Sequence, residues 1–202
     1  FGKPIILSTG MQDLETIKKS VKILKDASVS FALLECTNLY PSPPKNVSLK
    51  GILELKETFP NSIIGFSDHS IGPEMSLAAI ALGSSIIEKH FTDSRYRSGP
   101  DISCSMEPNE LRYLIDRSKE IHMSLNNKKS RTIEEEKVYK FARSSIVADK
   151  NIPKGKIISQ EDIWARRPGN GQIAGKDYEK IIGKKINKNK KFNEQLNWND
   201  FE

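Results

Sequence analysis

Two of the three histidines in this 202-residue chain stand at the ends of neighbouring apolar runs. His69 ends the run IIGFSDH, and His90 lies near the end of the run SIIEKHF. If the two runs are adjacent parallel strands, their backbones are about 4.8 Å apart, and the imidazoles can meet beyond the strand ends. Side chains alternate along a strand, so Ser67 shares a face with His69, and Glu88 shares a face with His90.

Two imidazoles with oxygen-bearing neighbours can hold a divalent cation and leave coordination positions open for water and substrate. A cation held in this way acts as a Lewis acid. The alternative is that each histidine makes its own hydrogen bonds at the end of a strand. The spacing of His69 and His90 leaves both interpretations open.

The elements that must position these histidines form four strand-then-helix units in the first 125 residues. Such units imply parallel strands with right-handed crossovers, and in a β/α barrel the chemistry lies at the carboxyl ends of the strands. The strand-like runs are continuously apolar, as expected for strands covered on both faces. The predicted strands are 4–9, 30–40, 63–69 and 85–91, and the predicted helices are 13–27, 48–59, 72–83 and 107–125.

Further candidate residues lie on the second predicted strand and after the fourth. Cys36, Asn38 and Tyr40 share one face of the second strand. The loop 92–106, which contains Asp101, is long for a β-to-α connection. Long loops are often functional, although a solvated surface loop is the alternative. A structural role is predicted for the third histidine and for both cysteines, which are His122, Cys36 and Cys104.

The pattern of residue types changes after the fourth predicted helix. Residues 126–140 are polar and charged and are predicted to form a linker, and short β-like runs broken by turns follow from 141 onwards. The segment 152–163 resembles the segment 186–196, and this alignment matches Gly155 with Asn189. Because Gly and Asn tolerate left-handed backbone, both copies are expected to carry the same tight turn. A small β domain with duplicated hairpins is the expectation.

Composition limits the classes of function. No apolar run approaches the ~18 residues of a membrane span, and no secretory signal is visible, so a soluble cytoplasmic protein without membrane contact is expected. Two cysteines without CxxC spacing suit a reducing compartment. Residues 126–202 carry 18 Lys and Arg against 11 Asp and Glu. Nucleic-acid binding is one interpretation of this excess, but a solvated lysine-rich face or attraction of an anionic substrate fits better, since no binding motif accompanies the lysines.

Five stretches, in this order, resemble the bacterial N-acetylneuraminate (sialic acid) synthase family: KPIILSTGM, LLECTNLYPSPP, IIGFSDHSIG, ALGSSIIEKHFTDSRYRSGPDISCSMEP and RRPGNG. The resemblance covers essentially the whole chain. It implies a TIM barrel followed by a small antifreeze-like (SAF) domain of β-clip type. It also implies a metal-dependent condensation of phosphoenolpyruvate with an open-chain N-acetylated hexosamine such as N-acetylmannosamine, with release of phosphate. The cofactor would be Mn²⁺ or Mg²⁺.

The resemblance also implies roles for individual residues. The metal ligands would be the two histidines, and the enol carbon would attack the sugar aldehyde that the metal activates. In this family the SAF domain of one subunit caps the barrel of the other, so a domain-swapped homodimer is expected. The implied residues are His69 and His90 for the metal, Ser8, Asn38 and Ser67 for phosphoenolpyruvate, Tyr40 and Asp101 for the reacting part of the sugar, and Arg167 and Phe141 for its N-acetyl region.

Only four of the eight barrel strands of the family are present, and the resemblance identifies them as strands five to eight. The expected organisation is a partial barrel over 1–125, a linker over 126–140 and a SAF domain over 141–202. The chain is therefore expected to be a piece of a longer synthase that is inactive by itself. A synthase for legionaminic or pseudaminic acid is one alternative, and a non-catalytic binding fragment built on the SAF domain is another.

Overall fold

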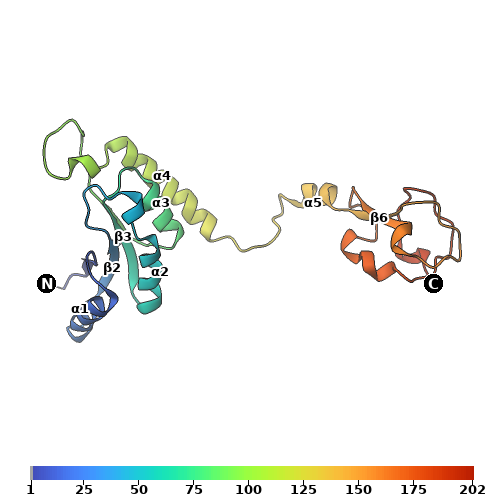
Figure 1. Ribbon diagram of the computed structural model, residues 1–202, viewed down its shortest axis with the longest axis horizontal. Coiled ribbons are helices and arrows are strands. Elements are labelled where there is room, and N and C mark those ends of the chain that lie inside the picture. The colour runs from blue at the N-terminus through green and yellow to red at the C-terminus, as the bar shows by residue number, and fades with distance from the viewer. Residues whose placement is uncertain (1) are drawn as a thin grey trace. The chain divides into compact units, whose positions relative to one another are not determined.

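The computed structural model describes residues 2–202, which form two compact units (Figure 1). The first unit extends to Asn127, and the second runs from Lys128 to Glu202. Among residues 2–202, no helix is both long enough and apolar enough to cross a membrane. Each unit is built around its own cluster of buried hydrophobic residues.

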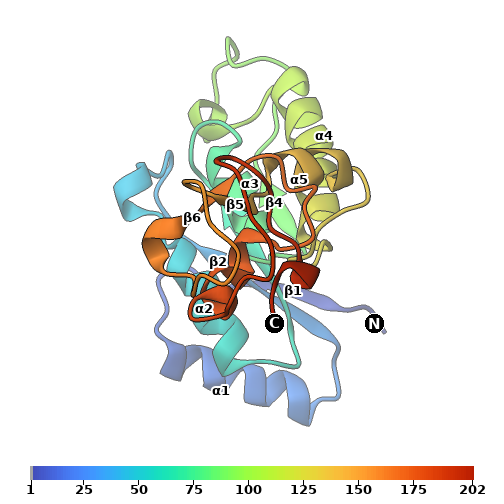
Figure 2. The same cartoon turned by 90° about the vertical axis from the view of Figure 1, so that its right-hand side faces the viewer.

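The first unit is a curled parallel sheet with helices between its strands, and it confirms the expected C-terminal half of a TIM barrel (Figure 2). The strands follow one another in chain order, and every neighbouring pair is parallel. The strands are β1 (Ile5–Ser8), β2 (Phe31–Cys36), β3 (Ile63–Asp68) and β4 (Ile87–Lys89), and the helices are α1 (Leu14–Asp26), α2 (Leu49–Thr58), α3 (Glu74–Ala81) and α4 (Pro108–Leu125).

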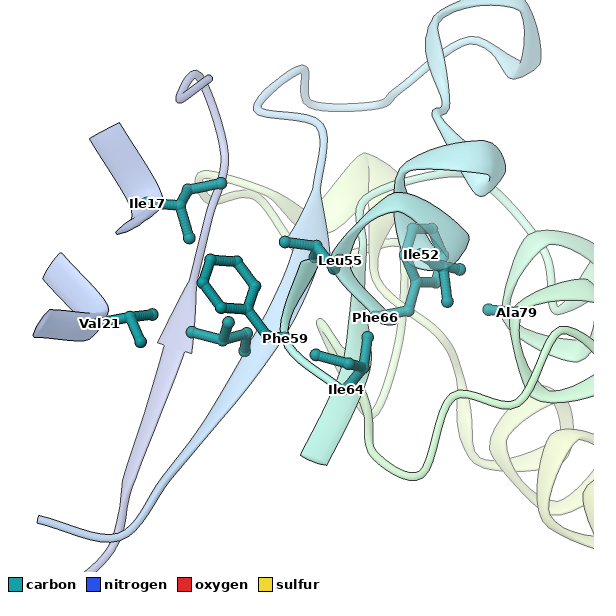
Figure 3. Close-up of a cluster of buried hydrophobic side chains, with 9 residues drawn as sticks. Ile17, Val21, Ile52, Leu55, Phe59, Ile64, Phe66 and Ala79 are labelled. Atoms are coloured by element: carbon teal, nitrogen blue, oxygen red, sulfur yellow. The ribbon is translucent and has the colours of Figure 1, made fainter. Parts of the chain in front are cut away.

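The helices are held to the sheet by apolar side chains at helical spacing. Ile17 and Val21 point from α1 toward the strands, and Ile52 from α2 lies near Phe66 of β3 (Figure 3). Phe66 and Ile52 are almost completely buried. This packing orients the carboxyl ends of the strands, where the candidate site residues lie.

All four strands are shorter than predicted, and the shortening of β2 changes the position of two candidate residues. Because β2 ends at Cys36, Asn38 and Tyr40 belong to the following loop, and the prediction that they continue one strand face is wrong. At this point the Thr37 carbonyl oxygen lies 2.8 Å from Nδ1 of His69. The first carbonyl after β2 is therefore hydrogen-bonded by the side chain of His69, which follows the end of β3.

The second unit combines a short helix, α5 (Glu136–Ala142), with an antiparallel pair of strands, β5 (Ser145–Ala148) and β6 (Ile163–Arg166). Residues 128–135 hold no helix or strand, whereas α5 begins inside the segment 126–140. The core of this unit consists mainly of isoleucines, all almost fully buried: Ile146, Ile152, Ile158, Ile163, Ile173, Ile181 and Ile186.

This unit contains an internal duplication in which Gly155 matches Asn193, so the predicted match of Gly155 with Asn189 is wrong. The amide of Gly155 donates to the Ile186 carbonyl, and the amide of Asn193 donates to the Ala148 carbonyl in the equivalent bond. Gly155 and Asn193 both have positive φ, at 87° and 69°. Asn189 is outside the left-handed region and instead accepts a hydrogen bond from the Lys154 amide through its side chain. Matching lysines favoured the alignment drawn from the sequence, but the reciprocal backbone pairing sets the true one.

Each copy of the duplication ends in a buried aspartate that forms ion pairs with lysines. The Asp162 carboxylate forms ion pairs with Lys156 and Lys150, and the equivalent Asp200 carboxylate forms ion pairs with Lys188 and Lys190. Burial by itself raises the pKa of each carboxyl, but hydrogen bonds from these lysines and from backbone amides outweigh it, and both pKa values lie below the usual range. The two ionised aspartates therefore support the fold of this unit at neutral pH.

In the first unit, the partly buried carboxyl of Glu35 destabilises the fold when it is ionised. Glu35 of β2 faces α2, where a Cβ atom on Gly51 would lie only 2.6 Å from its Oε2. Burial, and secondarily the charge of Glu54, raise the pKa of Glu35 to about 7. The folded state thus holds a proton that the unfolded chain releases above about pH 4.3. Stability consequently falls as pH rises from this value toward 7.

Replacing Glu35 by Gln should remove this pH-dependent loss. We expect Glu35→Gln to raise the free energy of unfolding by about 2 kcal/mol at pH 8, with the difference vanishing below about pH 4. Urea denaturation at both pH values measures it. Glu57→Gln, on the exposed side of α2, is the matched control and should change stability by less than about 0.5 kcal/mol. An unchanged Glu35→Gln stability at pH 8 would contradict the raised pKa.

Candidate functional site

The candidate site is built on the register between β3 and β4. Ser67 pairs with Glu88, and Asp68 pairs with Lys89, as direct neighbours across the two strands. His69 and His90 each follow the second of these pairs, so the same register brings the two histidines to one edge of the sheet. Their ring centroids are 5.2 Å apart. The sequence-based expectation that the imidazoles meet at the strand ends is met by this distance.

Tyr40 completes a cluster of three rings. Its ring centroid lies 4.1 Å from that of His69 and 5.7 Å from that of His90. The loop that carries Tyr40 is tied to His69, because the Ser42 amide donates a hydrogen bond to the His69 carbonyl at 2.8 Å. His69 is buried, whereas Tyr40 and the side chain of His90 are partly open to solvent. One side of the cluster is therefore accessible to a ligand.

The contacts of His69 define which of its nitrogens is free. Nδ1 lies 2.8 Å from the Thr37 carbonyl oxygen, which can only accept, so Nδ1 carries the proton and donates. In the neutral imidazole, Nε2 then keeps its lone pair. An Nδ1–H bond to a backbone carbonyl is the usual orienting contact of a metal-binding histidine. Cys36, 3.9 Å from the same Nδ1, stays a thiol because burial raises its pKa.

Asp101 brings a carboxylate to the histidine pair from the long loop. Its Oδ2 lies 3.9 Å from Nδ1 of His90. The loop returns to β4 through hydrogen bonds that join the Met106 amide to the His90 carbonyl and the Thr92 amide to the Met106 carbonyl. Asp101 itself has a left-handed backbone with φ of 62°, and its carbonyl accepts a hydrogen bond from Ser105 Oγ at 2.9 Å. The backbone of Asp101 is thus held while its carboxylate faces His90.

Ser67 and Glu88 form the next layer below the histidines. Ser67 is buried, and its hydroxyl donates to Glu88 Oε1 at 2.7 Å. Both residues, with Lys89 and His90, line a cavity of about 230 Å³. Glu88 thus joins the candidate residues, although no role was predicted for it from the sequence. Its alternation with His90 along the strand was the available signal.

Ser8 and Asn38 lie at the ends of the two preceding strands. Ser8 is exposed at the last position of β1, opposite Leu34 of β2. The Cys36 thiol donates to the Asn38 side-chain oxygen at 3.1 Å. Asn38 occupies the space in front of Gly10, since a Cβ atom there would lie 1.8 Å from Asn38 Oδ1. Asn38 is therefore held against the end of β1 only because residue 10 lacks a side chain.

Phe141 and Arg167 belong to the second unit. Phe141 lies in the last turn of α5 with an exposed ring, and Arg167 is exposed directly after β6. The segments that carry them are joined by a hydrogen bond from the Gly169 amide to the Lys140 carbonyl at 3.2 Å. The second unit thus presents these two candidates from neighbouring segments. Tyr40, His69, His90 and Asp101 are brought together by the first unit.

The residues present fit a divalent metal ion in part. Among residues 2–202 there is no cluster of three or more His, Cys, Asp or Glu side chains arranged to hold a metal ion. The free Nε2 of His69 and the nearby imidazole of His90 offer two nitrogen donors. The Asp101 carboxylate is the adjacent oxygen donor. This donor set suits an ion that keeps several positions for water or substrate.

The first unit is half of a β/α barrel with paired histidines at its strand ends, and a small β unit follows it in the chain. The family model of the NeuB family matches residues 1–130, and that of the SAF domain matches residues 143–202. The chain belongs to the NeuB family and carries a SAF domain.

Named relatives agree with this assignment. The chain is 41% identical over 198 residues to an N,N'-diacetyllegionaminic acid synthase of Campylobacter jejuni, a match that covers 96% of this chain and 59% of the relative. It is 36% identical to a pseudaminic acid synthase of the same species, covering 99% and 58%. The crystal structure of an N-acetylneuraminic acid synthetase from Leptospira borgpetersenii in complex with citrate aligns with a TM-score of 0.63 at 36% identity, covering 68% and 48%. The chain thus spans less than two thirds of these relatives.

The close approach of Gly10 and Asn38 can be tested directly. We expect Gly10→Ala to force the Asn38 side chain out of its position, because the new methyl group would overlap Asn38 Oδ1. A crystal structure, or a shift of the Asn38 side-chain amide signals in NMR, measures the displacement. Gly99→Ala is the matched control, since its Cβ would meet only ordinary contacts at 3.5 Å and beyond. An unmoved Asn38 in Gly10→Ala would contradict the packing described.

Proposed function

We propose that this chain is the C-terminal part of a nonulosonic acid synthase. The reaction condenses phosphoenolpyruvate with the open-chain form of an N-acetylated hexosamine and releases phosphate. The observation that carries the proposal is the cluster of His69, His90 and Tyr40 at the strand ends of a NeuB-family half-barrel. All three named relatives are, by name, synthases or synthetases of nonulosonic acids.

His69 and His90 are proposed to hold the divalent metal through their imidazole nitrogens, with Asp101 beside them. The metal would supply polarisation of the sugar aldehyde. Mn²⁺ fits a mixed nitrogen and oxygen donor set better than Mg²⁺, which prefers oxygen ligands and retains several waters. Thr37 orients His69 through Nδ1, so Nε2 would be the nitrogen that holds the metal.

The remaining residues are proposed to orient the two substrates. Ser67, Asn38 and Ser8 would bind phosphate or carboxylate oxygens of phosphoenolpyruvate from the ends of three strands. Tyr40 and Asp101 would line the sugar site, where Asp101 accepts hydrogen bonds from hydroxyls near the reacting carbon. Holding both reactants at these positions converts a bimolecular encounter into an intramolecular one. Carbon–carbon bond formation at the aldehyde is then followed by addition of water, and phosphate leaves with cleavage of its bond to carbon.

The SAF domain is proposed to complete the site of a second copy of the chain in a homodimer. Arg167 and Phe141 would contact the N-acetyl region of the sugar there. Both side chains are exposed on neighbouring segments of the second unit, which leaves them free to contact a ligand or another subunit. The positive charge of residues 126–202 would attract the anionic phosphoenolpyruvate.

Phosphate release from phosphoenolpyruvate tests the reaction. We expect release that depends on both Mn²⁺ and the sugar, and that EDTA abolishes. The assay compares the 202-residue chain with the chain together with any coding sequence that precedes it in its gene. The acceptors are N-acetylmannosamine and the diacetamido hexoses that give legionaminic and pseudaminic acids. The 41% identity to a legionaminic acid synthase favours the hexose that gives legionaminic acid. Absence of release from both proteins with every acceptor would contradict the proposal.

Single histidine variants test the metal site. His69→Ala and His90→Ala should each lower metal-dependent phosphate release by at least about 100-fold, because loss of a ligand costs more than loss of an outer partner. His122→Ala is the matched control, since this exposed histidine of α4 lies outside the ring cluster, and it should retain the wild-type rate. Wild-type rates in either strand-end variant would remove the histidines from the proposed site.

A further inference from the structure

Directly below the two histidines, an ion pair joins the same two strands. Lys89 Nζ lies 3.0 Å from Asp68 Oδ2, and the two side chains are 4% and 0% exposed. Asp68 and Lys89 are also register partners between β3 and β4. The pair therefore links the final positions of both strands, one residue before His69 and His90.

Both members of the buried pair have further hydrogen-bond partners. Asp68 Oδ1 accepts from the amide of Ser70 at 2.8 Å and from its hydroxyl at 2.7 Å, and Oδ2 accepts from the Ser76 hydroxyl at 2.7 Å. Lys89 also donates to the Ser70 carbonyl at 2.6 Å. A buried ion pair is tolerated only when its geometry and its further hydrogen bonds are nearly complete. The network accordingly permits little movement of its members.

The contacts of Lys89 tie its ammonium group to the strand ends. Its ammonium group is occupied by Asp68 and by the Ser70 carbonyl, and its side chain is closed to solvent. Asp68 likewise has hydrogen bonds on both oxygens, and one of them reaches Ser76 in α3. Both side chains are thus engaged in the ion pair and its hydrogen bonds, so we expect their effect on the site to be transmitted through the backbone.

The network holds the main chain on both sides of the buried histidine. Asp68 precedes His69 and Ser70 follows it, and the amide and carbonyl of Ser70 both belong to the network. The carbonyl of His69 itself accepts the Ser42 amide. On the other strand, Lys89 precedes His90, whose carbonyl accepts the Met106 amide. The ion pair thus lies one residue before both imidazoles in the chain, among the backbone contacts that hold them.

We propose that Asp68 and Lys89 are positioning residues that set the spacing of the two metal-binding imidazoles. The inference rests on the metal site of the proposed function. Partners in the outer shell of a metal site typically contribute about 10–100-fold to metal affinity. Loss of the pair should therefore weaken metal binding by about this factor even though neither residue contacts the ion.

The test is Mn²⁺ binding without substrates, measured by the electron paramagnetic resonance signal of free Mn²⁺. The full-length protein is compared with its double variant Asp68→Asn/Lys89→Met, which removes both charges and so leaves no single buried charge unpaired. We expect its Kd for Mn²⁺ to rise about 10–100-fold. Histidine side-chain NMR signals of the metal-free protein should shift in the double variant, as an independent sign that the imidazoles have moved.

A matched buried pair provides the control. Lys190 and Asp200 of the second unit lie 2.7 Å apart with side chains 3% and 0% exposed. The double variant Lys190→Met/Asp200→Asn should lose thermal stability but keep the wild-type Kd for Mn²⁺. Equal weakening in both double variants would overturn the inference, because general destabilisation would then explain the effect.

The remaining outcomes separate the inference from the proposed function. Absence of Mn²⁺ binding by the wild-type protein would overturn the proposed metal site and the inference together. Wild-type binding with a Kd unchanged in Asp68→Asn/Lys89→Met would overturn the inference alone. If that variant does not fold, Ser76→Ala replaces it, since it keeps the ion pair and removes one hydrogen bond to Asp68. A Kd raised about threefold to tenfold would support the inference, and an unchanged Kd would overturn it.

Discussion

The pairing of β3 with β4 is the constraint on which the candidate site depends. Three consecutive positions across these strands carry a hydrogen bond between Ser67 and Glu88, the ion pair of Asp68 and Lys89, and then the two histidines. A shift of one residue in either strand would turn the buried charges toward the wrong side and separate the imidazoles. Because an unpaired buried charge is strongly destabilising, the ion pair favours the register that brings the two histidines together.

Around this pair of strands, loops bring the other candidates into place by backbone contacts. The loop after β2 carries Tyr40 to His69, and the loop after β4 returns so that Asp101 faces His90. In both loops, the hydrogen bonds that fix the path involve the histidine carbonyls, which accept the amides of Ser42 and Met106. The rings and the carboxylate therefore converge because the loops are attached at the same two residues that carry the imidazoles.

The second unit achieves its stability differently. The two copies of its duplication form equivalent backbone hydrogen bonds with each other. Each copy also contains a buried aspartate that forms ion pairs with lysines. Lysines at these two positions are therefore used in folding, through ion pairs such as Lys150 with Asp162. Arg167, in contrast, is exposed.

Apolar periodicity in the sequence determined the four β/α units and the helix faces, because burial of Ile17, Val21 and Ile52 follows directly from their spacing. Strand alternation likewise placed Ser67 with His69 and Glu88 with His90. Only the tertiary structure decided where β2 ends, that Asn38 rests against Gly10, and how the two copies of the duplication align. It alone showed that Asp68 and Lys89 are partners. These features depend on contacts between segments far apart in the chain, and local propensity and spacing carry no information about which distant groups satisfy a buried charge or a backbone carbonyl.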